Sequence, residues 1–120
     1  MAEALRTLRG RGAIFAYLHG SRAPGAFRPN SDIDIAAYFD EPVPQAFDVV
    51  LPSGVDLLVL NAAPLELAGR VAMYGKLLFE EDSSARVVWE STTRKIYLDE
   101  LPRLECARRD FAEAVLWRGG

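Results

Sequence analysis

Residues 13–39 read AIFAYLHGSRAPGAFRPNSDIDIAAYF, and this stretch predicts two strands joined by a long polar segment. Residues 13–19 form an apolar run of strand length that stops at Gly20-Ser21. The residues that follow are rich in proline, glycine and asparagine, which favour turns and loops. Residues 32–39 begin with alternating polar and apolar side chains and then become apolar, which is typical of a central strand.

The two aspartates of this stretch, Asp32 and Asp34, are separated by one residue. Because side chains alternate between the faces of a strand, both carboxylates are expected on the same face. Like charges side by side need a compensating cation, a shared proton or full solvation. Asp56 is the only charged residue of the next predicted strand, residues 55–60 (VDLLVL). If that strand lies beside the second one, three carboxylates converge into a site for Mg²⁺ or Mn²⁺. Two such ions would clamp both oxygens of an in-line phosphoryl displacement.

The Gly20-Ser21 turn adds a second chemical function beside these carboxylates. Glycine lets backbone N–H groups approach a phosphate, and the Ser21 hydroxyl adds a donor. Arg22 and Arg28 could counter phosphate charge. Taken singly, these features are ordinary: a D-x-D pair often starts a strand without any metal, and a Gly-Ser pair is usually a plain turn. Their combination favours a nucleotide site.

The rest of the chain predicts helices around a small sheet. We expect a short helix over residues 2–9, a helix that Pro64 opens and Gly75 ends, and an edge strand over residues 76–80. From residue 83 to 117 the apolar spacing is helical, and Pro102 should break or kink this stretch into two helices. The expected fold is α/β (α+β), with a small mixed β-sheet flanked by helices.

Composition limits the classes of function. Half of the 120 residues are hydrophobic and 26% are charged, which is typical of one soluble globular domain spanning residues 1–120. The net charge of −3 and the scattered basic residues argue against direct nucleic-acid binding. No apolar run approaches the length of a membrane span, and the N-terminus lacks the apolar core of a signal peptide. A single cysteine fits the cytoplasm.

Three further side chains have mainly structural interpretations. His19, the only histidine, ends the first strand, and we interpret it as structural or loop-packing, with a nucleotide contact as the alternative. Cys106 is expected to be a small buried hydrophobe rather than a nucleophile. Trp117 is a candidate contact with a partner or a second copy of the chain. Such a short chain has no room for a separate substrate domain, so we expect a partner to supply substrate recognition.

These motifs resemble those of the nucleotidyltransferase superfamily: a Gly-Ser pair after the first strand, D-x-D on the next and a third acidic residue on a following strand. The wording HGSRAPGAFRPNSDIDI and the later stretch RVAMYGKLLFEED, residues 70–82, are similar to the minimal nucleotidyltransferases, the MntA-like antitoxins. The resemblance covers roughly residues 12–82 and leaves C-terminal helices at about 83–117. It implies a polymerase-β-like fold, ATP as the donor and Mg²⁺ as the cofactor, with two ions.

The resemblance also implies roles for individual residues. Asp32 and Asp34 would hold metal, and Asp56 would hold metal and act as the general base. The nucleotide-binding residues would be Gly20, Ser21, Arg22 and Ser31. One departure is Pro24, a position that is often basic in relatives, and it puts efficiency or donor preference in doubt more than the reaction class.

The leading hypothesis is therefore a cytoplasmic antitoxin that transfers AMP from ATP to a hydroxyl, a tyrosine in particular, of a HEPN-domain RNase toxin. Two alternatives remain open. The chain could neutralise the toxin by binding alone, without catalysis. Less in keeping with its length, it could modify a small molecule such as an aminoglycoside. The sequence also leaves open whether the chain forms a homo-oligomer.

Overall fold

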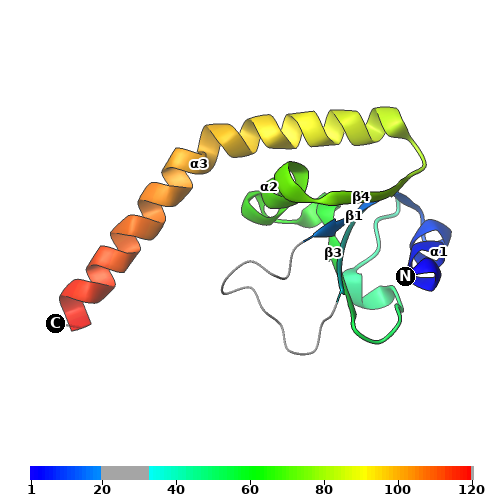
Figure 1. The fold of residues 1–120 in the computed structure, drawn as a ribbon, viewed down its shortest axis with the longest axis horizontal. Coiled ribbons are helices and arrows are strands. Elements are labelled where there is room, and N and C mark those ends of the chain that lie inside the picture. Colours follow the sequence, from blue (N-terminus) through cyan, green and yellow to red (C-terminus); the bar gives the residue numbers. More distant parts are fainter. Residues whose placement is uncertain (20–32, 120) are drawn as a thin grey trace.

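The computed structural model describes residues 1–19 and 33–119, and for residues 104, 105 and 107–119 it describes the backbone alone. Within these residues, the chain forms three α-helices, four strands and two short 3-10 helices (Figure 1). Their order is α1 (Ala2–Gly10), β1 (Ala13–His19), β2 (Ile33–Phe39), the short 3-10 helix η1 (Ala46–Asp48), β3 (Val55–Val59), the 3-10 helix η2 (Leu60–Ala62), α2 (Leu65–Tyr74), β4 (Lys76–Glu80) and α3 (Ser83–Gly119).

The strands form one sheet in the order β3-β2-β1-β4. β1 is antiparallel to both of its neighbours, β2 and β4, whereas β2 and β3 run parallel. The sheet is therefore mixed, and β4 lies at its edge. Both features confirm the prediction from sequence, and the parallel pair decides where the acidic residues meet.

The two faces of the sheet are covered by different helices (Figure 1). On one face, Ala4 and Leu8 of α1 pack against the buried Ile35 of β2. On the other face, Phe15 of β1 packs with residues of α2 and α3, and its ring centroid lies 5.5 Å from that of Trp89. Apolar side chains thus alternate between two cores along each central strand, which is the pattern of a sheet buried on both sides.

The first half of α3 packs closely on α2. Gly69 of α2 lies against Tyr97 of α3, and a Cβ atom on Gly69 would be 2.1 Å from the Tyr97 Cδ1 atom. Tyr97 is buried, with 6% of its surface exposed. Nearby, the Arg94 Nε atom donates a hydrogen bond of 2.6 Å to the carbonyl oxygen of Ala72. The absence of a side chain at Gly69 therefore lets the two helices approach.

α3 is one continuous helix of 37 residues with Pro102 inside it. The sequence predicts that Pro102 breaks or kinks this stretch into two helices. The division into two helices is wrong, whereas the kink agrees with the structure. Figure 1 shows the helix bending where its colour passes from yellow to orange and then extending beyond the sheet. Proline lacks the N–H that would bond the carbonyl four residues back, and its ring crowds that carbonyl. The result here is a bend that the flanking residues absorb without leaving the helix.

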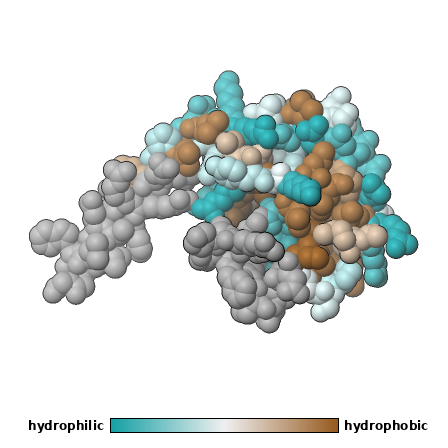
Figure 2. Space-filling view, viewed as in Figure 1, coloured by the Kyte–Doolittle hydropathy of each residue, from teal (hydrophilic) through white to brown (hydrophobic). Residues whose placement is uncertain are grey.

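Cys106 lies in the second half of α3, after Pro102, and it is exposed. The prediction of a buried cysteine is therefore wrong, and no described residue of the two apolar cores comes from this half of the helix. The outer side of the first half of α3 also carries exposed apolar side chains, namely Val87, Val88, Ile96 and Leu98. Figure 2 shows hydrophobic patches alternating with hydrophilic ones along this upper edge of the molecule. Among the described residues, no helix is long and apolar enough to cross a membrane.

Candidate functional site

Asp34 and Asp56 are neighbours across the parallel pair of strands. Each is the second residue of its strand, and the two are register partners in the β2–β3 ladder. Since partners in a parallel ladder at the same register share a face, the two carboxylates lie side by side. Asp34 has 7% of its surface exposed and Asp56 is half-buried. The strand adjacency on which the sequence prediction depended is confirmed.

His19 continues this row on the next strand. It is the last residue of β1 and the register partner of Asp34 in the antiparallel β1–β2 ladder. Opposed residues in such a ladder have their side chains on the same face. His19, Asp34 and Asp56 therefore form a row across three strands, which we call the site row. The next row inward, Tyr17, Ala36 and Leu58, belongs to the core beneath α2 and α3.

Seven residues that sequence analysis assigned to the site, or discussed beside it, lie outside the described residues: Gly20, Ser21, Arg22, Pro24, Arg28, Ser31 and Asp32. They belong to the segment that joins His19 to Ile33. Both of those residues are at the same end of the sheet as Asp34 and Asp56. The predicted phosphate-binding and acidic residues are thus joined covalently to the end of the sheet that carries the site row.

The described part of the site row fits a hard divalent cation. Its two carboxylates supply oxygen ligands, which Mg²⁺ prefers, and one of them is almost fully buried. Within residues 1–19 and 33–119, no three acidic, histidine or cysteine side chains gather closely enough to bind a metal together. His19 therefore does not complete a three-ligand set with Asp34 and Asp56. Asp32, the third ligand that the sequence predicts beside Asp34 and Asp56, lies outside the described residues.

A polar cluster anchors α3 directly beneath the site row. The Tyr17 hydroxyl donates a hydrogen bond of 2.6 Å to the Glu90 Oε2 atom. Arg86 contacts the same carboxylate at 3.2 Å and Glu80 of β4 at 2.5 Å, so the cluster ties β1, β4 and α3 together. Arg94 reaches the Glu90 Oε1 atom at 2.6 Å. Arg86, Glu90 and Arg94 are four residues apart in the sequence, a spacing that predicts contacts along one side of a helix. Tyr17 and Glu90 are 73 residues apart, so no local sequence pattern predicts their contact.

The same cluster shifts the ionisation of its members. Burial raises the pKa of the Tyr17 hydroxyl, and its hydrogen bond to Glu90 raises it further. Burial alone would raise the pKa of Glu90, but hydrogen bonds from Tyr17 and Arg86 and the charge of Arg94 outweigh it and lower that pKa. Tyr17 therefore stays neutral and Glu90 charged at pH 7. Tyr17 is a structural donor and not a nucleophile.

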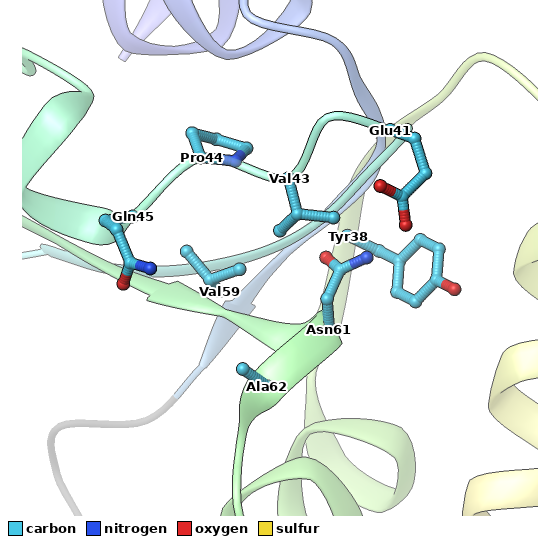
Figure 3. A pocket seen from close by; sticks show the side chains of 8 residues that line it. All are labelled: Tyr38, Glu41, Val43, Pro44, Gln45, Val59, Asn61 and Ala62. Carbon is cyan, nitrogen blue, oxygen red and sulfur yellow. The ribbon is translucent and has the colours of Figure 1, made fainter.

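A shallow pocket of about 480 Å³ lies at the other end of β2 and β3 (Figure 3). Its lining residues are Tyr38, Glu41, Val43, Pro44, Gln45, Val59, Asn61 and Ala62. Tyr38 is four residues along β2 from Asp34, which is about 13 Å at the rise of a strand. The Asn61 amide, moreover, exchanges two hydrogen bonds of 2.9 Å with the backbone of Phe39, extending the ladder past the end of β3. This pocket is separate from the site row and carries one carboxylate, so we do not assign the chemistry to it.

Comparisons with known proteins identify the fold and the family of this chain. A sequence comparison with curated proteins finds no match. Among solved structures, a toxin–antitoxin crystal structure with AMP-PNP matches with a TM-score of 0.66 and 25% identity, over 96% of this chain and 97% of that one. The crystal structure of the toxin–antitoxin MntA-HepT matches with a TM-score of 0.64 and 24% identity, over 93% of this chain and 92% of that one.

A third structure has the same TM-score, identity and coverage as the second (0.64, 24%, 93% and 92%): a tri-AMPylated Shewanella oneidensis HEPN toxin in complex with MNT antitoxin. These structural similarities show that the chain shares its fold with these proteins. The family model described as "Polymerase beta, Nucleotidyltransferase" matches residues 6–84, which is more than half of the chain and includes the whole site row. The chain therefore belongs to the polymerase beta nucleotidyltransferase family.

Proposed function

We propose that this chain is a Mg²⁺-dependent adenylyltransferase and antitoxin, which moves AMP from ATP to a tyrosine hydroxyl of a partner HEPN toxin. The observation that carries the proposal is the register pairing of Asp34 with Asp56 on one face of the sheet. Membership of the nucleotidyltransferase family supports the reaction class. The neighbours solved with AMP-PNP and with a tri-AMPylated HEPN toxin support ATP as the donor and such a toxin as the acceptor.

In this proposal the acidic residues have distinct roles. Asp34, together with Asp32, holds the metal, and Asp56 both binds metal and accepts the proton of the acceptor hydroxyl. The hydroxyl oxygen then bonds to the α-phosphorus of ATP, the bond between the α- and β-phosphates breaks, and pyrophosphate leaves with the electron pair. Bound Mg²⁺ would neutralise the charge of the phosphates and of the developing transition state. Positioning and electrostatic stabilisation supply most of the rate enhancement.

Gly20, Ser21, Arg22 and Ser31 are proposed to bind the phosphates of the donor, through backbone and side-chain donors. We place the reaction in the cytoplasm, in keeping with the single cysteine, and treat residues 1–120 as a single catalytic domain. The toxin itself is proposed to supply much of the recognition.

Intact-mass spectrometry of the toxin tests the proposal. A HEPN-domain toxin is incubated with the purified chain, ATP and Mg²⁺. We expect the toxin to gain the mass of one AMP group or a multiple of it, and Asp56→Asn to abolish the gain. Asp48→Asn, at an exposed aspartate of η1, is the matched control and should transfer AMP normally. Full transfer by Asp56→Asn would refute the assignment of Asp56.

The second candidate function is neutralisation by binding alone. It is favoured by one observation, that the structural neighbours named above are complexes of toxin and antitoxin. The same experiment separates the two. If the toxin is neutralised while its mass stays unchanged in the presence of ATP and Mg²⁺, the chain acts as a binder and the catalytic proposal fails.

A further inference from the structure

The three residues of the site row lie in a fixed order across the sheet. Asp34 stands in the middle, with Asp56 on β3 to one side and His19 on β1 to the other. Adjacent strands lie about 4.8 Å apart, so the row extends over roughly 10 Å between its outer members. His19 is half-buried, at the point where β1 ends.

An in-line displacement at phosphorus also fixes the relative positions of two groups, the attacking oxygen and the leaving oxygen. The attacking and leaving oxygens lie on opposite sides of the reacting phosphorus. In the function proposed above, on which this inference rests, Asp56 takes the proton of the attacking hydroxyl. The attack then comes from the β3 side of the row, and pyrophosphate leaves toward the β1 side, where His19 ends its strand.

We propose that His19 donates a hydrogen bond to the departing pyrophosphate and so acts as a leaving-group residue in AMP transfer. Even a neutral imidazole carries one N–H donor. Hydrogen bonds to charged phosphate oxygens are shorter and stronger than those between neutral groups. No proton is transferred in this contact. The α–β phosphate bond breaks with its electron pair on pyrophosphate, and the N–H group stabilises the charge that develops there.

A metal-ligand role for His19 is less consistent with the structure. Within the described residues, His19 does not gather with Asp34 and Asp56 into a three-ligand metal group. His19 is only half-buried, whereas Tyr17, two residues earlier on the same face of β1, has 2% of its surface exposed, so the end of β1 leaves part of the His19 side chain accessible to a ligand.

Binding of inorganic pyrophosphate and of AMP to the full chain tests the proposal without a toxin. His19→Phe removes the donor and keeps a planar ring of similar size. We expect it to weaken pyrophosphate binding about tenfold in the presence of Mg²⁺, which is the effect of one such hydrogen bond, and to leave AMP binding unchanged. His19→Gln, which restores an N–H donor, should recover at least part of the loss. The rate constant for transfer, kcat, should follow pyrophosphate affinity.

Lys76→Met is the matched control, because it removes a nearby positive charge from the opposite face. Lys76 is exposed and is the register partner of Leu18, whose side chain points away from the site row. It should bind pyrophosphate as the wild type does. Unfolding midpoints of all variants check the fold, and His19→Leu, which also lacks an N–H donor, replaces His19→Phe if that variant folds poorly.

Three results would overturn the proposal. His19→Phe could bind pyrophosphate normally, could lose AMP and pyrophosphate affinity equally, or could have a defect that His19→Gln does not relieve at all. If the wild type transfers AMP in any of these cases, the proposed function stands and the role of His19 falls. If the wild type binds neither ATP nor pyrophosphate, both fail together.

Discussion

Asp34 and Asp56 are register partners on the parallel strands β2 and β3, so that two carboxylates share one face about one strand spacing, ~4.8 Å, apart. Such a pair is costly without a counter-charge, and Asp34 is nearly buried. A divalent cation bound between the two carboxylates would offset their repulsion. This relationship leads to the first prediction.

Mg²⁺ should stabilise the wild-type chain, and Asp34→Asn should remove that effect. A ligand present at 100 times its dissociation constant adds about 2.7 kcal/mol to the free energy of unfolding. For a chain of this size, that raises the unfolding midpoint by roughly 10 °C. We expect the Asp34→Asn variant to show the same unfolding midpoint with Mg²⁺ as with EDTA. Thermal unfolding with Mg²⁺ or EDTA measures this response in both proteins.

Asp48→Asn serves as the control, since it removes an equal charge from an exposed position and should keep the full Mg²⁺ response. An undiminished Mg²⁺ shift in Asp34→Asn would show that the cation binds elsewhere.

Much of this arrangement could be predicted because it depends on local patterns. Strand alternation placed Asp34 on the face opposite Ile35, and apolar runs bounded by turn residues located β1 and β4 at the residues that the structure shows. The resemblance to the nucleotidyltransferase motifs then predicted that Asp56 lies beside the Asp32/Asp34 pair. The alternation of side chains alone could not predict this neighbour, because two strands joined by residues 40–54 can pair in parallel or antiparallel.

The remaining features depend on contacts between distant parts of the chain. Tyr17 and Glu90 are 73 residues apart, and nothing near either residue indicates that they meet. The exposure of Cys106 follows from how far α3 extends beyond the sheet, which helical periodicity does not reveal, since periodicity indicates a face but not what covers it. Pro102 marks a disturbance in the helix, but whether it ends or only bends depends on the residues around it.

Gly69→Ala should loosen the attachment of α3 to α2. The added Cβ would lie 2.1 Å from the Tyr97 ring, and the ring is buried, so either the helices separate or the ring moves. We expect a loss of about 1–3 kcal/mol in the free energy of unfolding, the range for overpacked cores. Gly10→Ala is the control, because a Cβ there meets nothing within 4 Å at the end of α1. Chemical denaturation compares the two, and equal stability would mean that the close approach at Gly69 is not needed.

Tyr17→Phe should change how stability depends on pH in the alkaline range. Burial and the bond to Glu90 raise the folded-state pKa of Tyr17 above its ordinary value of 10.0. Its contribution is therefore fully present below pH 10 and is lost as the pH rises, because the unfolded chain ionises first. At neutral pH we expect Tyr17→Phe to cost about 1 kcal/mol for the lost hydrogen bond. From pH 9 to 11 it should lose stability less steeply than the wild type.

Tyr74→Phe is the control for this series, since Tyr74 is 77% exposed and should neither cost stability nor alter the alkaline slope. Urea denaturation at several pH values gives the slopes, and parallel curves for the wild type and Tyr17→Phe would contradict the assignment.

Glu90→Gln should have the opposite pH signature, in acid. The bonds from Tyr17 and Arg86 and the charge of Arg94 lower the folded-state pKa of Glu90 below its ordinary value of 4.5. The stability that comes from this carboxylate is present above pH 4.5 and is lost as the pH falls, because the unfolded chain binds the proton first. Glu90→Gln should therefore be less stable at pH 7 and should lose less stability between pH 5 and 3.

Glu3→Gln, at an exposed residue of α1, is the control, and its stability should follow that of the wild type at every pH. If Glu90→Gln followed the wild type as well, the carboxylate would not anchor α3 beneath the site row, and the two arginines would have to hold the helix through Glu80 and the Ala72 carbonyl alone.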